Sequence, residues 1–163
     1  MNMNTIFSIS PLDWYSIFTV LFCSIIIGLE RQLRGKPVGI RTAAMISLGT
    51  YLFIAAAMAT RLDQSDPLRI VGQVVTGIGF LGAGVIMKQN GIVVGVTSAA
   101  TIWALASISV LIALGHRITA IKLSILVVAI LYGIDLLERS SRLLRKGVHR
   151  KKNVKHNVVC EEE

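Results

Sequence analysis

The stretch Ile70–Met87, with the sequence IVGQVVTGIGFLGAGVIM, decides the fold class of this chain. Its 18 residues carry no charge. As an α-helix they would rise about 27 Å, close to the ~30 Å hydrocarbon core of a bilayer. Five of them are glycines, which destabilise a helix interior and so need a packing or functional reason. We expect a membrane helix whose function depends on its small residues.

The two sides of this predicted helix differ in size. On a 100° wheel the small side consists of two adjacent stripes: Gly72, Thr76, Gly79 and Ala83, then Gln73, Gly77 and Gly84. The bulky residues on the opposite side are Ile70, Val74, Ile78, Leu81 and Val85. We expect the bulky side to meet lipid, and the small side to meet the backbone of another helix or to line a polar path. The candidate functional residues are Gln73, Thr76, Gly77, Gly79, Gly82 and Gly84.

The composition indicates a small polytopic membrane protein. Hydrophobic residues make up 53% of the 163 residues, and the mean hydropathy is +0.68. The net charge is +8, but the basic residues lie beside apolar segments, so we expect contact with anionic lipid headgroups and no nucleic-acid partner. The two cysteines, Cys23 and Cys160, form no disulfide framework and no metal-spaced pair.

Five apolar segments predict an all-α bundle of about five transmembrane helices, at residues 14–29, 42–60, 70–87, 92–114 and 118–134. The bundle would occupy residues 12–136, followed by a basic, amphipathic and then disordered cytoplasmic tail at 137–163. Residues 88–91, Lys-Gln-Asn-Gly, would be a short turn between two antiparallel helices. With the N-terminus outside and the C-terminus inside, the inner segments hold 13 of the 17 lysines and arginines, which is the arrangement that the positive-inside rule favours.

The first inner loop carries four candidate residues. Glu30 and Arg34 are four apart and can form an ion pair at the membrane surface. Arg31, Arg34 and Lys36 fit contacts with lipid phosphates. Glu30 and Arg41 each adjoin an apolar run, so each should have a partner inside the bundle. Thr42, next to Arg41, completes the candidate set of this loop.

The outer loop before the glycine-rich helix carries Asp66, Pro67 and Arg69. An aspartate followed by proline is typical of a helix start, with Asp66 as the N-cap. Asp63 and Asp66 could also attract a divalent cation. Two carboxylates without further oxygen ligands make a weak Mg²⁺ site, so capping is the favoured role and no metal site is predicted.

The fourth segment has a small-residue stripe of its own, formed by Thr97, Ala100, Thr101, Ala104 and Ser107. We expect it to pack against the third segment, with Thr97, Ser98 and Thr101 bonding to carbonyls of their own helix. The alternative is a polar seam along which Gln73 and Thr76 face Thr97 and Thr101. Packing explains the glycines, but it explains Gln73 less well.

Catalysis has no support in this sequence. The chain carries no nucleophile-and-base pair and no metal triad. The glycine spacing in GIGFLGAG lacks the preceding strand that a nucleotide-binding loop needs. We therefore predict a protein that is not an enzyme and has no cofactor.

Several motifs in order along the chain resemble the MgtC/SapB family of bacterial membrane proteins. They are GLERQ at 28–32, Gly39-Ile40-Arg41-Thr42, Asp66-Pro67-Leu68-Arg69-Ile70, GQVVTGIGFLGAGVIM at 72–87 and GVTSAATIW at 95–103. The resemblance covers about residues 28–114 and implies a multi-pass protein of the bacterial inner membrane. It also implies roles in growth at low magnesium, in survival within host macrophages and in restraining the membrane sector of F-type ATP synthase.

The chain departs from the family pattern at two places. Ala43 stands where many members have histidine after Gly-Leu-Arg-Thr. The chain stops at Glu163 without the ACT-like cytoplasmic domain of virulence-type members, so it resembles the short, membrane-only form. We expect it to act by helix contacts with another membrane complex, the ATP synthase membrane sector by resemblance. The alternative is a magnesium or proton transporter or channel formed by a homo-oligomer.

Overall fold

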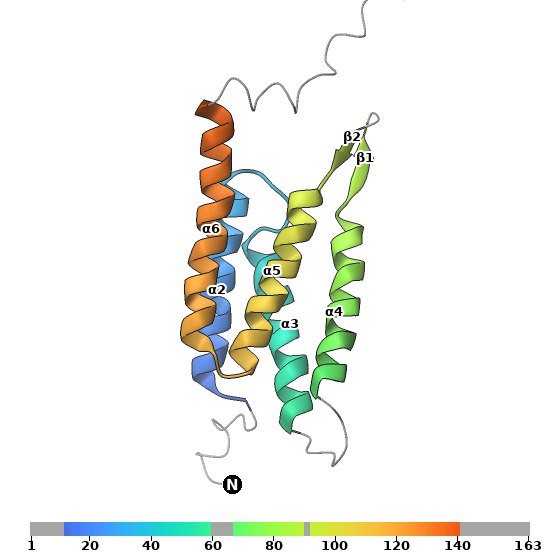
Figure 1. The fold of residues 1–163 in the computed structure, drawn as a ribbon, viewed down its shortest axis with the longest axis vertical. Helices are drawn as coiled ribbons and strands as arrows, with labels where there is room; N and C mark the ends of the chain where they lie inside the picture. The colour runs from blue at the N-terminus through green and yellow to red at the C-terminus, as the bar shows by residue number, and fades with distance from the viewer. Residues whose placement is uncertain (1–11, 60–66, 90–91, 141–163) are drawn as a thin grey trace, which may run out of the picture. The chain divides into compact units, whose positions relative to one another are not determined.

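The computed structural model describes residues 12–59, 67–89 and 92–140 (Figure 1). Its elements are α2 (Trp14–Leu33), α3 (Ile40–Ala59), α4 (Pro67–Gly84), β1 (Met87–Gln89), β2 (Ile92–Val94), α5 (Val96–Ala113) and α6 (Arg117–Ser140). Within this described part, four helices are long and apolar enough to cross a membrane: α2, α3, α5 and α6 from Arg117 to Ile134. The all-α, membrane-type fold expected from the sequence is confirmed.

The chain divides into two compact units, Met1–Val128 and Ala129–Glu163. In the first unit α2, α3 and α5 pack against one another, and α4 packs against α3 and α5 (Figure 1). Large apolar side chains fill the centre of this unit, among them Ile27, Ile54, Ile102, Leu105 and Ile112, each no more than 2% exposed. In the second unit the described residues are the last turns of α6, residues 129–140.

Helices α2 and α3 approach each other most closely at Gly28. A Cβ at this position would lie 2.7 Å from the Cα of Ile40, closer than real Cβ contacts come. Glycine is therefore required here. The loop that follows α2 is tight. Val38 in this loop is buried and has a positive φ of 68°. The Gln32 side chain accepts a hydrogen bond from the Ile40 N–H at 3.2 Å.

The third predicted span differs from the structure at its end. The sequence interpretation continued the helix to Met87 and began the next at residue 92, but α4 ends at Gly84 and α5 begins at Val96. Between them β1 and β2 form an antiparallel hairpin that pairs Met87 with Val94, Lys88 with Val93 and Gln89 with Ile92. Helix α4 nevertheless has 18 residues, as many as α5, although it is not one of the four candidate spans.

A polar cluster around Asp13 lies at the end of the first unit opposite the hairpin. Asp13 caps α2 by accepting a hydrogen bond from the Ser16 N–H at 3.1 Å. Its carboxylate also accepts a bond from the Tyr51 hydroxyl at 3.3 Å and pairs with Arg117 at 3.4 Å. Partial burial raises the pKa of Asp13, but the bonds from Ser16, the Arg117 charge and the Tyr51 bond outweigh it, so the pKa lies below its ordinary value.

Candidate functional site

The small side of α4 is exposed and its bulky side is turned toward the bundle. Ile78 is only 7% exposed, and Val74 is half-buried. Gly72, Gly77 and Gly79 have no atom within 4 Å of where a Cβ would be. The expectation that the bulky side meets lipid is wrong for Ile78, because α3 and α5 supply the apolar surface against which it packs.

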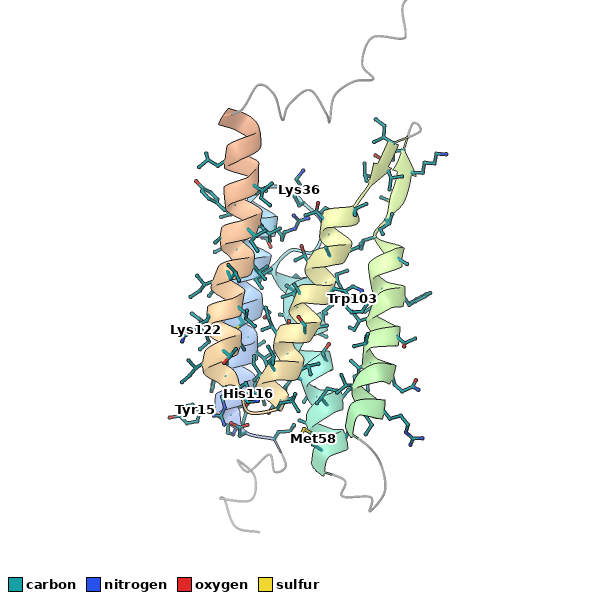
Figure 2. All side chains as sticks on the ribbon, viewed as in Figure 1. Tyr15, Lys36, Met58, Trp103, His116 and Lys122 are labelled. Carbon is teal, nitrogen blue, oxygen red and sulfur yellow. The ribbon has the colours of Figure 1, made fainter. Side chains whose placement is uncertain are left out.

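One glycine of α4 takes part in packing within the bundle. A Cβ at Gly82 would lie 3.7 Å from the Trp103 ring and 3.8 Å from Ala99, in ordinary contact. Figure 2 shows Trp103 on the side of α5 that faces α4. Helix α5 therefore meets α4 through Ala99 and Trp103. Of the predicted stripe, Thr97, Ala100 and Ser107 are exposed and Thr101 is buried.

Helices α3 and α4 enclose an open apolar groove of about 550 Å³. Its lining residues are Met45, Ile46, Gly49, Thr50, Phe53, Gln73, Val74, Gly77, Ile78 and Leu81. Gly49 and Gly77 leave open space where side chains would otherwise stand. Gln73 is exposed and brings an amide into an almost wholly apolar lining. Inside a bilayer such an amide requires a hydrogen-bond partner.

The predicted polar seam is not assembled among the described residues. The Thr76 hydroxyl donates to the Gly72 carbonyl oxygen at 2.9 Å, and it lies on the exposed side of α4. The Thr101 hydroxyl donates to the Thr97 carbonyl oxygen at 2.8 Å and is buried. Gln73 instead belongs to the groove with α3. The prediction that Thr101 bonds to its own helix is confirmed.

A charged cluster lies where α2 ends and α5 begins. Arg31 is 4% exposed, and its Nη2 donates a hydrogen bond to the Ser98 hydroxyl, 67 residues away in the chain. Its Nε donates to the Pro37 carbonyl oxygen at 3.4 Å. One guanidinium thus joins α2, the following loop and the first turn of α5. The expected contact of Arg31 with lipid phosphate is wrong, because the side chain points into the bundle.

Glu30 shares this cluster. The predicted pair with Arg34 is confirmed, with 2.6 Å between Glu30 Oε1 and Arg34 Nε. Both carboxylate oxygens of Glu30 are buried, and neither accepts a directed hydrogen bond from the described residues. The contact with Arg34 is therefore an ion pair that lacks hydrogen-bond geometry. A buried carboxylate held this way depends on its cation, because removal of the cation would leave an uncompensated charge.

The remaining predicted site residues are more exposed or fall outside the described ranges. Arg41 and Thr42 are exposed at the start of α3, and Arg69 is exposed in the first turn of α4. No bundle partner of Arg41 is found among the described residues. Asp66, with its predicted capping role, lies in a segment that is not described. Gly84 is exposed with open space at its Cβ position.

No metal-type cluster is formed by residues 12–59, 67–89 and 92–140, where no three His, Cys, Asp or Glu side chains come together. What these residues offer chemically is an apolar groove with one amide, a line of open glycines, and a buried arginine that joins two helices and a loop. Together with the helices they define a multi-pass helical membrane protein.

Comparison with known proteins gives the family. The sequence profile of the MgtC family matches residues 17–140, so the chain belongs to the MgtC family. A protein of Salmonella typhimurium named "Protein MgtC" is 41% identical over 112 residues, which are 69% of this chain and 48% of that protein. A protein of Escherichia coli K12 named "Putative magnesium transporter YhiD" is 41% identical over 130 residues, 76% of this chain and 60% of that protein.

An uncharacterized protein of Haemophilus influenzae is 38% identical over 146 residues, 82% of this chain and 58% of that protein. The chain thus spans about half to three-fifths of the length of these relatives. No solved structure matches it.

Proposed function

We propose that this protein acts without catalysis, in the inner membrane of a bacterium, by binding a transmembrane helix of another membrane complex in the groove between α3 and α4. The observation that carries the proposal is the groove itself, largely apolar apart from Gln73 and Thr50 and widened by Gly49 and Gly77. Small residues at such a surface let the backbone of a second helix approach closely, which is how helices associate in lipid.

The exposed amide of Gln73 gives this surface a polar point. An amide that faces hydrocarbon leaves its donors and acceptor unsatisfied, and that costs free energy. A partner helix with a hydroxyl, an amide or a free carbonyl at the same depth would satisfy it. Measured bonds of this type between membrane helices contribute about 0.6–2 kcal/mol. The partner we propose is the membrane sector of F-type ATP synthase, on the resemblance described above, with a role in adaptation to low magnesium or host-cell stress.

Photocrosslinking tests this contact directly. A photoreactive amino acid at Phe53, which is 69% exposed in the groove, should crosslink to a membrane-sector subunit, detected with an antibody against that subunit. The same residue at Phe18 of α2, 65% exposed and outside the groove lining, is the matched control. Crosslinks from both positions, or from neither, would contradict the groove as the contact surface.

A second arm uses the glycines. Gly77→Leu fills the groove, whereas Gly79→Leu adds the same side chain on a neighbouring position outside the groove lining. Both positions have open space, so both variants should insert and fold. We expect Gly77→Leu to lose the Phe53 crosslink and its effect on ATP-driven proton pumping in inverted vesicles, and Gly79→Leu to retain both. Equal loss in the two variants would speak against the groove.

The second candidate function is ion transport, which the printed name of the Escherichia coli relative favours. It predicts Mg²⁺ or proton flux into proteoliposomes that contain this protein alone. Flux that Gln73→Leu abolishes would replace the contact proposal. An absence of flux at every imposed gradient would count against transport.

A further inference from the structure

The β1–β2 hairpin is a ribbon with two unlike faces. In an antiparallel pair, opposite residues share a face, and the face alternates along each strand. The observed register therefore places Met87, Gln89, Ile92 and Val94 on one face, and Lys88 with Val93 on the other. The first face, which we call the apolar hairpin face, is largely uncovered, with Met87 at 53% and Ile92 at 50% exposure.

The length of α4 fixes the depth of this ribbon. Helix α4, Pro67–Gly84, rises about 27 Å over its 18 residues, against a hydrocarbon core of about 30 Å. With Arg69 at one interface, the helix ends short of the other. The first residues of the hairpin then lie at the boundary between acyl chains and headgroups. Figure 1 shows the hairpin at the end of α4 away from its first residue.

Basic side chains lie at the same end of the bundle as the hairpin. The Arg31–Ser98 bond holds the end of α2 at the first turn of α5, directly after β2. The exposed residues Lys36, Arg41 and Lys88 therefore belong to the same end. Figure 2 shows Lys36 there, with Met58 and His116 at the other end. Positive charge beside an apolar ribbon at the bilayer boundary complements an anionic lipid surface.

We infer that the β1–β2 hairpin is an interfacial lipid anchor. Met87, Ile92 and Val94 insert into the acyl boundary of one leaflet, while Lys88 and Lys36 contact the phosphates of anionic phospholipids. The anchor lies at the interface beyond the last residue of α4 and so sets the depth of the α4–α5 pair in the membrane. This inference is independent of the partner proposed for the α3–α4 groove.

Site-directed spin labelling in vesicles tests the insertion. In the full chain with Cys23 and Cys160 replaced by alanine, a label is placed at Ile92→Cys or at Val93→Cys. These two positions are adjacent and comparably exposed, at 50% and 57%, but lie on opposite faces. We expect the label at 92 to collide mainly with oxygen, which concentrates in hydrocarbon, and the label at 93 to collide mainly with a water-soluble nickel complex.

Nickel accessibility that is equally high at the two positions would overturn the inference, because it would place the whole hairpin in water. Shielding of position 92 from both reagents would overturn it as well, because it would mean that a protein covers the apolar face. Dipolar broadening between labels would identify that protein as a second copy of the chain.

The lipid arm compares vesicles of phosphatidylcholine alone with vesicles that also contain phosphatidylglycerol. We expect the label at 92 to move deeper when phosphatidylglycerol is present, and Lys36→Gln with Lys88→Gln to remove most of that shift. A depth that does not change with lipid charge in the unsubstituted chain would show that anionic lipid is not the partner.

Discussion

The guanidinium of Arg31 is buried at the end of α2, where it donates hydrogen bonds to Pro37 and Ser98. Its planar group can bond in two directions at once, which a lysine ammonium on a flexible stem does less well. The side chain holds the loop and the first turn of α5 on α2, at the end that carries the hairpin. Loss of the Arg31 hydrogen bonds should therefore destabilise this whole end of the bundle.

We predict that Arg31→Lys destabilises the protein by about 2 kcal/mol, since a hydrogen bond to a charged group contributes about 1.5–3 kcal/mol. Unfolding of the purified protein in mixed micelles with increasing SDS would measure the change. Lys36→Arg, at an exposed position in the same loop, is the control and should alter stability little. An Arg31→Lys protein as stable as the unsubstituted one would show that the Ser98 bond contributes nothing.

The ion pair of Glu30 and Arg34 follows from sequence spacing, since residues four apart on a helix are neighbours. The Arg31–Ser98 bond has no such signal. From the sequence, Arg31 could have faced lipid phosphate or the bundle, and only the rotation of α2 within the bundle decides that it turns inward.

At the scale of the element, the hairpin between α4 and α5 has a turn signal in the sequence that the stronger hydropathy pattern of the neighbouring spans obscured. Asn90-Gly91 is a dipeptide typical of two-residue β-hairpins, and it lies between MKQ and IVV. Met87 and Ile92–Val94 are also apolar enough to extend the neighbouring spans. The longer hydropathy pattern therefore suggested helix up to Met87.

Gly95 joins the hairpin to α5 and should tolerate no side chain. Its φ is +93°, and a Cβ would collide with the carbonyl oxygen of Val85. Gly115 has a similar φ of +89° but open space, and Gly77 has open space on a regular helix. We predict that replacement by alanine destabilises the protein most at position 95 and least at position 77. At position 115 we expect a loss of about 1–2 kcal/mol, the cost of a left-handed backbone for a residue with a side chain.

The same SDS titration measures this order, and circular dichroism checks that each variant is helical before unfolding. A Gly95→Ala protein no less stable than Gly115→Ala would mean that the chain around Val85 moves aside without cost.

The rotation of α4 about its own axis also differs from the rotation expected from the sequence. The wheel set a small side opposite a bulky side. It assigned the bulky side to lipid, although Ile78 is buried and Gly72, Gly77 and Gly79 face open space. A helix at the edge of a bundle can turn either side inward, because lipid and protein interior are similarly apolar. The neighbours α3 and α5 decide the rotation.

At the scale of the whole molecule, Asp13 joins three helices through Ser16, Tyr51 and Arg117. Its pKa is lowered in the folded protein, so the stability that it contributes is fully present above the unfolded value of 3.8 and is lost as the pH falls through the folded pKa. We predict that Asp13→Asn lowers the unfolding temperature at pH 7, and that the difference from the unsubstituted protein shrinks as the pH falls below about 3.8.

Thermal unfolding in detergent at a series of pH values, with both proteins side by side, isolates Asp13 from the other carboxylates. The carboxylate is half exposed, so the effect should be modest. A difference that persists unchanged to the lowest pH would show that the charge of Asp13 is not what stabilises this end.

The two ends of the first unit also differ in charge, which bears on orientation. Arg31, Arg34, Lys36, Arg41 and Lys88 lie at the hairpin end. From the positive-inside rule we expect this end to lie in the cytoplasm. We predict that a membrane-impermeant maleimide labels His116→Cys in intact cells and Lys36→Cys only after permeabilisation, in a background with Cys23 and Cys160 replaced by alanine. The reverse labelling would overturn the expected orientation.

The sequence by itself determined that this is a helical membrane protein of the MgtC family, where its apolar helices lie to within a few residues, and that Glu30 pairs with Arg34. Periodicity, hydropathy and motif spacing are properties of the local chain, and they fix what is local. Tertiary structure alone decided that Arg31 binds Ser98, that Gly72, Gly77 and Gly79 face open space, and that Gln73 belongs to a groove with α3. Each of these depends on how a helix is rotated against its neighbours, and in an apolar surrounding no residue pattern fixes that rotation.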